Sequence, residues 1–387
     1  MRVVIAPDKF KGSLDAAGVA GALAAGVRDV VPEADCVPVP MADGGDGTVE
    51  AFLAGGATAR TVRVSGPLGE PVDAAYARDG ATAVIEMAAA SGLALLGGGR
   101  LDARRASTRG TGELLRDALD GGARRILLGI GGSATTDGGA GALAALGARF
   151  FDGEGAELEP VPEALAAVAR IDLGGLDPGV RPSSTSGEAE VRIAVACDVD
   201  SPLLGPLGAA AVFGPQKGAS SADVAFLDRG LARLADAMTA ATGRDLRHRP
   251  GAGAAGGLGW ALASACGAQL ERGVALVAAV RGLSGALRGA DWCFTGEGRI
   301  DAQTLRGKVV DGVAALAREA GVRVVVAFGG SVDLAAEREL RALGVRCVPI
   351  APGPLSLEEA MRTAATNLRA AAARATALLL AHHDHGE

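Results

Sequence analysis

Lysine is nearly missing from this chain, in which four lysines are outnumbered by thirty-four arginines. All four lie in glycine-containing segments, as Lys9, Lys11, Lys217 and Lys308. A compact ammonium group on a flexible stem is preferred where a point charge must reach a phosphate or carboxylate. Chance survival at the surface is the alternative, but none of the four lies in an amphipathic-helix pattern, where a solvating lysine is expected. The distribution therefore favours a polyanionic ligand.

Other scarce residues exclude several classes of protein. Aromatic residues make up 3% of the chain and its net charge is −7, so we expect no nucleic-acid partner, which normally requires a basic patch and stacking aromatics. The five cysteines form no CxxC pair, which argues against a zinc knuckle or a disulfide framework. Three of the four histidines lie in the tail at 382–385, which we interpret as a frayed terminus.

Long apolar runs are missing too. No uninterrupted apolar stretch approaches the roughly 20 residues of a membrane span. The apolar run at 3–6 is too short for the core of a signal peptide. We therefore expect no membrane partner and a cytoplasmic location.

The chain does have a repeating unit, in which a short β-branched run is followed by a glycine turn and an alanine- and leucine-rich helix pattern. The predicted strands are 2–6, 124–130, 291–296, 322–330 and 345–351, and the predicted helices are 14–30, 137–147, 308–320, 334–343 and 356–380. This alternation indicates an α/β fold, a Rossmann-like three-layer arrangement around a parallel sheet. The turns after the strands then meet at the carboxyl edge of the sheet, where ligands of such folds bind.

The length of 387 residues suggests two domains. Two extended runs, 71–77 and 82–87, are typical of an antiparallel pair, and 151–190 is predicted to be a loop excursion. We expect a Rossmann-like domain made from 1–64 and 287–387, a second α/β domain inserted at 65–286, and an active site in the cleft between them. A simple division into N-terminal and C-terminal halves is the alternative.

Two familiar nucleotide-binding motifs are matched only in part. The run 251–256 has the GxGxxG spacing, but Arg247-His248-Arg249-Pro250 precedes it where the motif requires a strand. The P-loop pattern around Lys308 lacks its first glycine and its Ser/Thr.

The segment 129–143 is a stronger phosphate-site candidate, because it follows a predicted strand and precedes a predicted helix. Backbone N–H groups in such a turn can hold phosphate, aided by the partial positive charge of the helix N-terminus. The alternative is a capped turn with Asp137 as N-cap. The candidate phosphate-binding residues of this turn are Gly131, Gly132, Ser133, Thr135 and Thr136.

Three acidic glycine turns each follow a predicted strand, at 41–48, 196–205 and 295–304. Each alone could be a capping turn. Together they suit Mg²⁺, which takes one or two carboxylates and keeps waters and substrate phosphates. Lysines and carboxylates in neighbouring turns are the ingredients of phosphoryl transfer.

The motifs together resemble the bacterial glycerate kinase family of the type without a Walker A motif. The shared blocks, in order, are APDKFKGSL (6–14), PMADGGDGT (40–48), GTGELL (110–115), GGSATTDGGAG (131–141), ACDVDSPLLG (196–205), FGPQKGA (213–219), PGAGAAGGLG (250–259) and FTGEGRIDAQTLRGK (294–308). The resemblance implies phosphorylation of D-glycerate by ATP with Mg²⁺, with 2-phosphoglycerate favoured over 3-phosphoglycerate. Position 9 is often Ser in similar proteins, which makes Lys11 the firmer functional lysine.

On this basis each candidate residue has an expected role, although the sequence does not decide which carboxylate is the general base. The catalytic candidates are Lys11, Asp8 and Asp198; the further substrate- or phosphate-binding candidates are Lys9, Lys217, Arg299 and Lys308; the Mg²⁺ candidates are Asp43, Asp46, Glu297 and Asp301. The rival functions are a NAD-dependent oxidoreductase of a small hydroxy acid, which would use the 251–256 run, and a non-catalytic two-domain anion-binding protein. The sequence does not reveal an oligomeric state.

Overall fold

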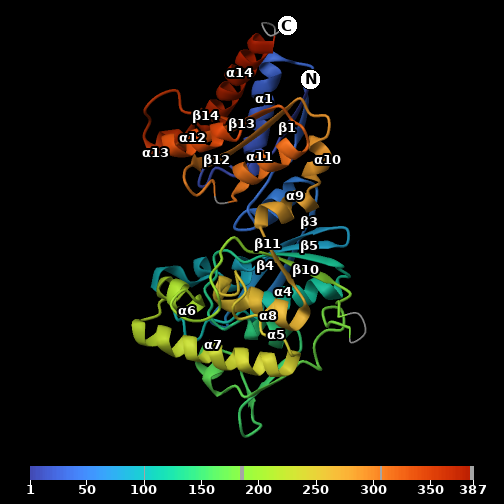
Figure 1. Ribbon diagram of the computed structural model, residues 1–387, viewed down its shortest axis with the longest axis vertical. Helices are drawn as coiled ribbons and strands as arrows, with labels where there is room; N and C mark the ends of the chain where they lie inside the picture. Colours follow the sequence, from blue (N-terminus) through green and yellow to red (C-terminus); the bar gives the residue numbers. More distant parts are fainter. Residues whose placement is uncertain (100, 184–186, 306, 384–387) are drawn as a thin grey trace. The chain divides into compact units, whose positions relative to one another are not determined.

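The computed structural model describes residues 1–99, 101–183, 187–305 and 307–383. The chain divides into two compact units, unit 1 (Met1–Asp43, Glu50–Gly56 and Val274–Glu387) and unit 2 (Gly44–Val49 and Ala57–Gly273). Figure 1 colours unit 1 blue and orange to red, because it is assembled from the two ends of the chain. Each unit has its own sheet and is described separately.

Unit 1 is built on a five-stranded sheet in the order β14-β13-β12-β1-β2. All four neighbouring pairs are parallel, as the alternation of apolar runs and helix patterns predicts. The strands are β1 (Arg2–Ile5), β2 (Asp35–Pro38), β12 (Trp292–Ile300), β13 (Val324–Val332) and β14 (Val345–Pro349).

The three central strands of unit 1, β1, β12 and β13, are buried on both faces over most of their length, which explains their apolar runs. Val3 and Ile5 pack on one face with α1 (Ala16–Val30) and α14 (Ala364–His383), which lie side by side in Figure 1. The two helices approach so closely that a Cβ on Gly26 would lie 2.1 Å from the Arg369 carbonyl oxygen. The other helices assigned to this part of the chain are α2 (Thr48–Ala54), α9 (Gly273–Val280), α10 (Leu283–Leu287), α11 (Val309–Glu319), α12 (Leu334–Ala342) and α13 (Leu357–Arg362).

The strand order of unit 1 creates a switch point. β1 leads to β2 on one side of the sheet, whereas β12 leads to β13 and β14 on the other side. Ligands of open parallel sheets bind outside the carboxyl ends of the strands at such a reversal. The residues that follow β1 and those at the end of β12 therefore lie where a ligand site is expected.

Unit 2 has a six-stranded sheet in the order β11-β10-β6-β5-β4-β3. The first four strands run parallel to one another, and β4 pairs antiparallel with both β5 and β3. The predicted antiparallel pair is thus confirmed as β4 and β5. The strands are β3 (Thr58–Ser65), β4 (Pro71–Asp79), β5 (Thr82–Glu86), β6 (Arg125–Gly129), β10 (Arg192–Ala196) and β11 (Gln269–Glu271).

One helix of unit 2 has a recognisable cap at each end. In α7 (Ser221–Thr242), Ser220 and Asp223 form a reciprocal capping box, and Gly243 ends the helix in the left-handed conformation. The remaining helices of unit 2 are α3 (Ala88–Ser91), α4 (Arg109–Asp120), α5 (Ala140–Ala145), α6 (Ala209–Phe213) and α8 (Leu258–Cys266), with 3₁₀ turns η1 (Leu93–Gly99), η2 (Pro162–Ala167), η3 (Pro215–Lys217) and η4 (Ala254–Gly257).

Three local predictions were wrong. The helix predicted over 356–380 is two helices, because α13 ends at its C-cap, Thr363, before α14 begins. The 151–190 excursion contains β8 (Glu157–Leu158) and β9 (Arg170–Asp172), which pair antiparallel with β7 (Arg149–Phe151). The strand predicted over 291–296 continues to Ile300, so that Glu297 and Arg299 lie within β12 rather than after it.

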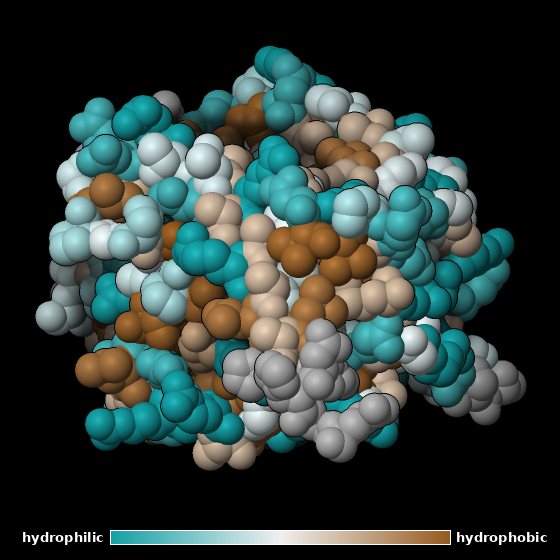
Figure 2. Space-filling view, turned by 90° about the horizontal axis from the view of Figure 1, so that it is seen from above, coloured by the Kyte–Doolittle hydropathy of each residue, from teal (hydrophilic) through white to brown (hydrophobic). Residues whose placement is uncertain are grey.

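The surface of unit 1 mixes polar and apolar side chains. Figure 2, seen from above, shows hydrophilic residues interspersed with smaller hydrophobic groups. The exposed large apolar residues of the unit include Leu334, Leu357 and Leu378, which belong to three different helices. Among the described residues, the structure has no helix both long enough and apolar enough to cross a membrane.

Candidate active site

The turn after β1 carries Asp8, the most unusual carboxyl group of unit 1. Its backbone N–H donates to the Gly296 carbonyl oxygen of β12 at 2.8 Å, and its Oδ1 accepts the Lys9 N–H at 2.7 Å. Burial raises the pKa of Asp8 to about 7, and the neighbouring Asp43 and Glu297 carboxylates push it in the same direction. A carboxyl group with this pKa can gain or release a proton near neutral pH, as a general base requires.

Glu297 lies on β12 with 5% of its surface exposed. Burial raises the pKa of Glu297 to about 7, against the opposing effects of the Thr304 hydrogen bond and the Lys308 charge. The Thr304 hydroxyl donates to Glu297 Oε1 at 2.5 Å. Our sequence analysis missed Thr304. The sequence did contain a local indication of this residue, because Asp301 stands three residues before Thr304. The Asp301 N–H donates to the Thr304 hydroxyl oxygen at 2.9 Å.

Asp8, Asp43 and Glu297 constitute the carboxylate cluster of unit 1, in which each of the other two raises the pKa of Asp8. Within the described parts of the chain, no three His, Cys, Asp or Glu side chains are arranged to hold a metal ion on their own. Of the four predicted Mg²⁺ ligands, Asp43, Glu297 and Asp301 belong to unit 1, whereas Asp46 belongs to unit 2. The cluster on its own is thus a set of oxygen donors, and a Mg²⁺ ion there would also require phosphate and water ligands.

Lys11 lies at the tip of a tight turn that follows Asp8. The N–H groups of Ser13 and Leu14 both donate to the Phe10 carbonyl oxygen, at 2.8 and 3.0 Å. Gly12 has φ +78°, a conformation that favours glycine. Phe10 is 4% exposed and anchors the turn in the core, while Lys11 is exposed. The turn therefore holds its backbone firmly and leaves the ammonium group at the surface.

The two remaining cations of this unit differ in their contacts. Lys308 is the N-cap of α11, and its charge acts on Glu297. Arg299 has a 75% exposed side chain, with its Nε 3.2 Å from Asp301 Oδ2. Arg299 therefore offsets the charge of Asp301, one of the predicted Mg²⁺ ligands.

In unit 2, the glycine turn between β6 and α5 is organised by Asp137, which is fully buried. Its carboxylate accepts hydrogen bonds from the Thr108 N–H and hydroxyl at 2.7 and 2.8 Å, and from the N–H groups of Gly139 and Gly141 at 3.0 and 3.2 Å. Burial raises the pKa of Asp137, and these four bonds oppose the increase. Asp137 is not the N-cap of α5, as the alternative above would have it, because Gly139 occupies that position; the Asp137 carboxylate nevertheless accepts two N–H groups at the start of the helix. Thr108 was missed.

Lys217 is 1% exposed, and its Nζ donates to the Thr135 carbonyl oxygen at 2.6 Å. Burial lowers the pKa of Lys217 to about 7, and the nearby Asp137 carboxylate opposes the decrease. We expected this lysine to approach a phosphate. The structure gives it a backbone contact that stabilises the glycine turn, and any contact with phosphate stays a prediction.

The glycine turn itself offers groups that the protein leaves unused. Among the described residues, the buried hydroxyls of Thr135 and Thr136 have no hydrogen-bond partner, a costly situation for polar groups out of water. Gly131 and Gly132 are exposed, and Ser133 is 8% exposed. The predicted phosphate-binding residues are therefore together in one turn.

The 251–256 run does not form a dinucleotide-binding turn. It follows a turn rather than a strand, and it leads into η4. A Cβ on Gly256 would lie 2.1 Å from the Thr135 carbonyl oxygen, so glycine is needed for close packing against the neighbouring turn. Close packing therefore explains the glycine at position 256 without a bound nucleotide.

Asp46 and Asp198 lie in two turns of unit 2 that meet. A Cβ on Gly44 would be 2.3 Å from the Ala196 Cβ, which shows how closely the 41–48 segment packs on the end of β10. Asp198 Oδ1 accepts the Gly273 N–H at 3.1 Å, and both acidic side chains are exposed. Both residues belong to unit 2, whereas the carboxylate cluster defined above belongs to unit 1.

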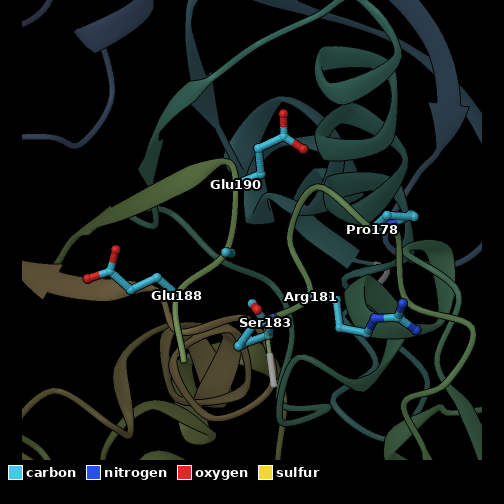
Figure 3. Close-up of a pocket in the computed structure, with 7 residues that line it drawn as sticks. Pro178, Arg181, Ser183, Glu188 and Glu190 are labelled. Atoms are coloured by element: carbon cyan, nitrogen blue, oxygen red, sulfur yellow. The ribbon is translucent and has the colours of Figure 1, made fainter. Parts of the chain in front are cut away.

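One large pocket contains none of the predicted site residues. It has a volume of about 730 Å³ and is lined by residues within 178–183 and 188–190, where Figure 3 shows the Arg181 and Glu188 side chains pointing away from each other. The Glu190 carboxylate forms an ion pair with Arg124. With no lysine or hydroxyl-bearing glycine turn, this pocket offers no phosphoryl-transfer chemistry.

Comparison with known proteins is consistent across sequence and structure. The model of the glycerate kinase family matches residues 3–380. The chain is 46% identical to a glycerate kinase of Bacillus subtilis (strain 168) over 94% of each chain, and 46% identical to a glycerate 2-kinase of Escherichia coli (strain K12) over 86% of each. The crystal structure of a proposed glycerate kinase 2 from Salmonella typhimurium LT2 superposes with a TM-score of 0.88 at 43% identity and covers 99% of each chain.

Proposed function

The chain belongs to the glycerate kinase family, and from this premise we propose that it transfers the γ-phosphoryl group of ATP to the 2-hydroxyl of D-glycerate, with Mg²⁺. The enzyme is a phosphotransferase with an alcohol group as acceptor. The name of the Escherichia coli relative, glycerate 2-kinase, supports the 2-hydroxyl as the acceptor. We also propose that the reaction takes place in the cytoplasm.

The observation that carries the mechanism is the half-buried Asp8 carboxyl with a pKa of about 7, three residues before the exposed Lys11. In the proposed step, the glycerate hydroxyl oxygen forms a bond to the γ-phosphorus and the bond from that phosphorus to the β,γ-bridging oxygen breaks. Asp8 accepts the hydroxyl proton, and ADP leaves. Lys11 stabilises the charge on the transferring group, a task suited to an ammonium on a flexible stem.

The glycine turn of unit 2 supplies the second part of the proposal. The Thr135 and Thr136 hydroxyls, which have no partner in the described part of the chain, and the Ser133 hydroxyl are donors that a phosphate or carboxylate oxygen would satisfy. Lys217 acts indirectly, since it holds the Thr135 carbonyl and so the shape of the turn. We propose that one reaction requires both this turn and the carboxylate cluster, which belong to different units.

The residues present fit Mg²⁺, because the carboxylate cluster provides oxygen donors whose deprotonated forms a dication would favour. Asp43 and Glu297 are the proposed ligands, leaving Asp8 as the base. Bound Mg²⁺ would neutralise phosphate charge. Asp46 and Asp198, on the exposed turns of unit 2, are assigned no step.

A coupled assay tests the reaction and its regiochemistry. The enzyme is incubated with D-glycerate and MgATP, and enolase is added without phosphoglycerate mutase. Prompt appearance of phosphoenolpyruvate supports the 2-phosphoglycerate product, whereas phosphoenolpyruvate formed only after mutase is supplied means the 3-isomer. Absence of ATP turnover with D-glycerate would refute the proposed reaction, and turnover without added Mg²⁺ in the presence of EDTA would refute the metal requirement.

A further inference from the structure

A second pocket, which lies entirely within unit 1, is not explained by the residues assigned so far. Its volume is about 420 Å³, within the range of roughly 300–1,000 Å³ typical of small-molecule and cofactor sites. It lies outside the carboxyl ends of the strands, with Gly298 of β12, Gly330 of β13 and Ile350 after β14 in its wall. This is the sheet edge where ligands of parallel sheets bind.

The walls of this pocket combine apolar surface with a few polar groups. Its apolar part includes the side chains of Phe10, Ile350, Leu355 and Met361. Ser13, Ser331 and Asn367 contribute hydroxyl and amide groups, which can recognise the edge of a heterocycle or a ribose hydroxyl. An apolar cleft with a small number of polar groups is the usual form of a site for a flat organic ligand.

The pocket adjoins the proposed phosphoryl-transfer residues. Lys11 forms part of its wall, and Gly298 directly follows Glu297 in the chain. A Cβ on Gly298 would lie 3.6 Å from both the backbone nitrogen of Lys11 and the Phe10 Cα, so the end of β12 lies against the Lys11 turn. The Ser13 hydroxyl also donates to the Met361 carbonyl oxygen at 2.8 Å, which ties that turn to α13.

We propose that this pocket binds the adenine and ribose of ATP, with the phosphates extending toward Lys11; the inference rests on the proposed function. D-Glycerate is a poor candidate for the same pocket. A three-carbon hydroxy acid would leave most of 420 Å³ unfilled and would bring its carboxylate against apolar side chains, where a charge is costly. A nucleoside matches both the apolar walls and the polar groups.

The test is to fill the pocket with Ala360→Phe, on α13, and to measure binding of ADP by calorimetry without glycerate. The added ring occupies space that the nucleoside needs, and even one methylene group changes pocket selectivity by about 10–200-fold, so we expect ADP affinity to fall by more than about tenfold. Binding of tripolyphosphate, which lacks the nucleoside, should change by less than about twofold. Ala370→Phe, at an exposed position of α14 outside the pocket, is the matched control and should bind ADP normally.

Asn367→Leu provides a second variant that does not fill the pocket. Loss of one amide hydrogen bond should weaken ADP binding by about two- to tenfold, with the KM for D-glycerate unchanged. Normal ADP binding by correctly folded Ala360→Phe, or a rise in the KM for D-glycerate in place of ATP, would overturn the nucleoside assignment. Because ADP binding is measured without turnover, a failed kinase assay with intact ADP binding would refute the proposed reaction and leave the pocket assignment standing.

Discussion

Lys11 of unit 1 and Lys217 of unit 2 both lie in glycine-containing turns, yet one is exposed and the other is 1% exposed. Lys11 shares its turn with Asp8, a carboxyl withdrawn from water, and its own ammonium remains at the surface. Lys217 is withdrawn from water itself and donates to the Thr135 backbone. The scarcity of lysine singles out both positions, but burial decides whether the cation is available to a ligand or serves the protein.

The pKa shifts in the two units also have opposite directions. Burial raises the pKa of the Asp8 and Glu297 carboxyls of unit 1 to about 7, and it lowers the pKa of the Lys217 ammonium of unit 2 to about 7. In each case water loss favours the neutral form. Unit 1 therefore contains proton acceptors poised near neutral pH, and unit 2 contains a cation that depends on its protein partners.

The largest expected effect comes from Lys11→Met. If Lys11 stabilises charge in the transition state, turnover should fall by about 10²–10³-fold, the range for loss of one such donor. The midpoint of urea unfolding should not change, because the side chain is exposed. Arg338→Met, at an exposed position of α12, is the control and should keep full activity. Near-normal turnover in Lys11→Met would remove this lysine from the mechanism.

Unlike Lys11→Met, Lys217→Met should reduce stability as well as turnover. The substitution leaves the Thr135 carbonyl without its donor and Asp137 without its nearby cation. An unsatisfied buried polar group costs about 1–3 kcal/mol, and we expect the free energy of unfolding to fall by that order. Urea denaturation of both lysine variants measures the contrast directly. Equal stability of Lys217→Met and the unchanged enzyme would mean that Lys217 does not support the turn.

The raised carboxyl pKa values predict how stability changes with pH without ligand or Mg²⁺. Between about pH 4 and pH 7 the folded protein holds protons on Asp8 and Glu297 that the unfolded chain has released, so the free energy of unfolding should decrease as pH rises. Since Asp8 is partly exposed, its contribution should be on the order of 1–2 kcal/mol. This is less than the rise from its ordinary pKa to about 7 would give if it acted in full, at roughly 1.4 kcal/mol for each pKa unit.

Asp8→Asn should flatten this decrease, as measured by urea unfolding at several pH values in EDTA. The lowered pKa of Lys217 predicts that stability changes with pH in the opposite direction, and over a higher pH range. Between about pH 7 and 10.5 the unfolded chain holds a proton that the folded protein has lost, so stability should rise with pH. An unchanged slope in Asp8→Asn would show that another group carries the titration.

The repeating pattern of strands and helices was predictable because it depends on local burial. The predicted strand 322–330 was correctly assigned, because its residues 324–328 are all apolar and β13 is covered on both faces there. The break at Thr363 was not predictable from periodicity, since alanine- and leucine-rich sequence continues on both sides of it. Glu297 was expected after a strand because glycines flank it, but those glycines allow β12 to lie close to its neighbour: a Cβ on Gly296 would lie 2.5 Å from the Phe328 carbonyl oxygen.

The candidate site was predictable by residue type more than by role. Thr135 and Thr136 were identified because small and hydroxyl-bearing residues follow a strand. The contact between Lys217 and Thr135 joins positions 82 residues apart, so the burial of that lysine follows from tertiary packing that no local pattern records. A compositional anomaly can therefore locate a special residue without deciding what the residue contacts.

The smallest expected effect tests whether the unpartnered hydroxyls of unit 2 serve a ligand. Thr136→Val removes a buried hydroxyl that has no partner among the described residues, so stability should stay the same or increase by up to about 1 kcal/mol. If the hydroxyl contacts substrate, the KM for ATP or D-glycerate should rise by about two- to tenfold. Thr376→Val in α14 is a matched control, because within the described chain that hydroxyl is also buried without a partner, but it belongs to unit 1 and to neither of the turns discussed above. The control should show the same stability change with unaltered kinetics. If both variants behave alike in every measurement, the Thr136 hydroxyl is only a tolerated polar atom, and ligand binding by this turn would have to come from its backbone.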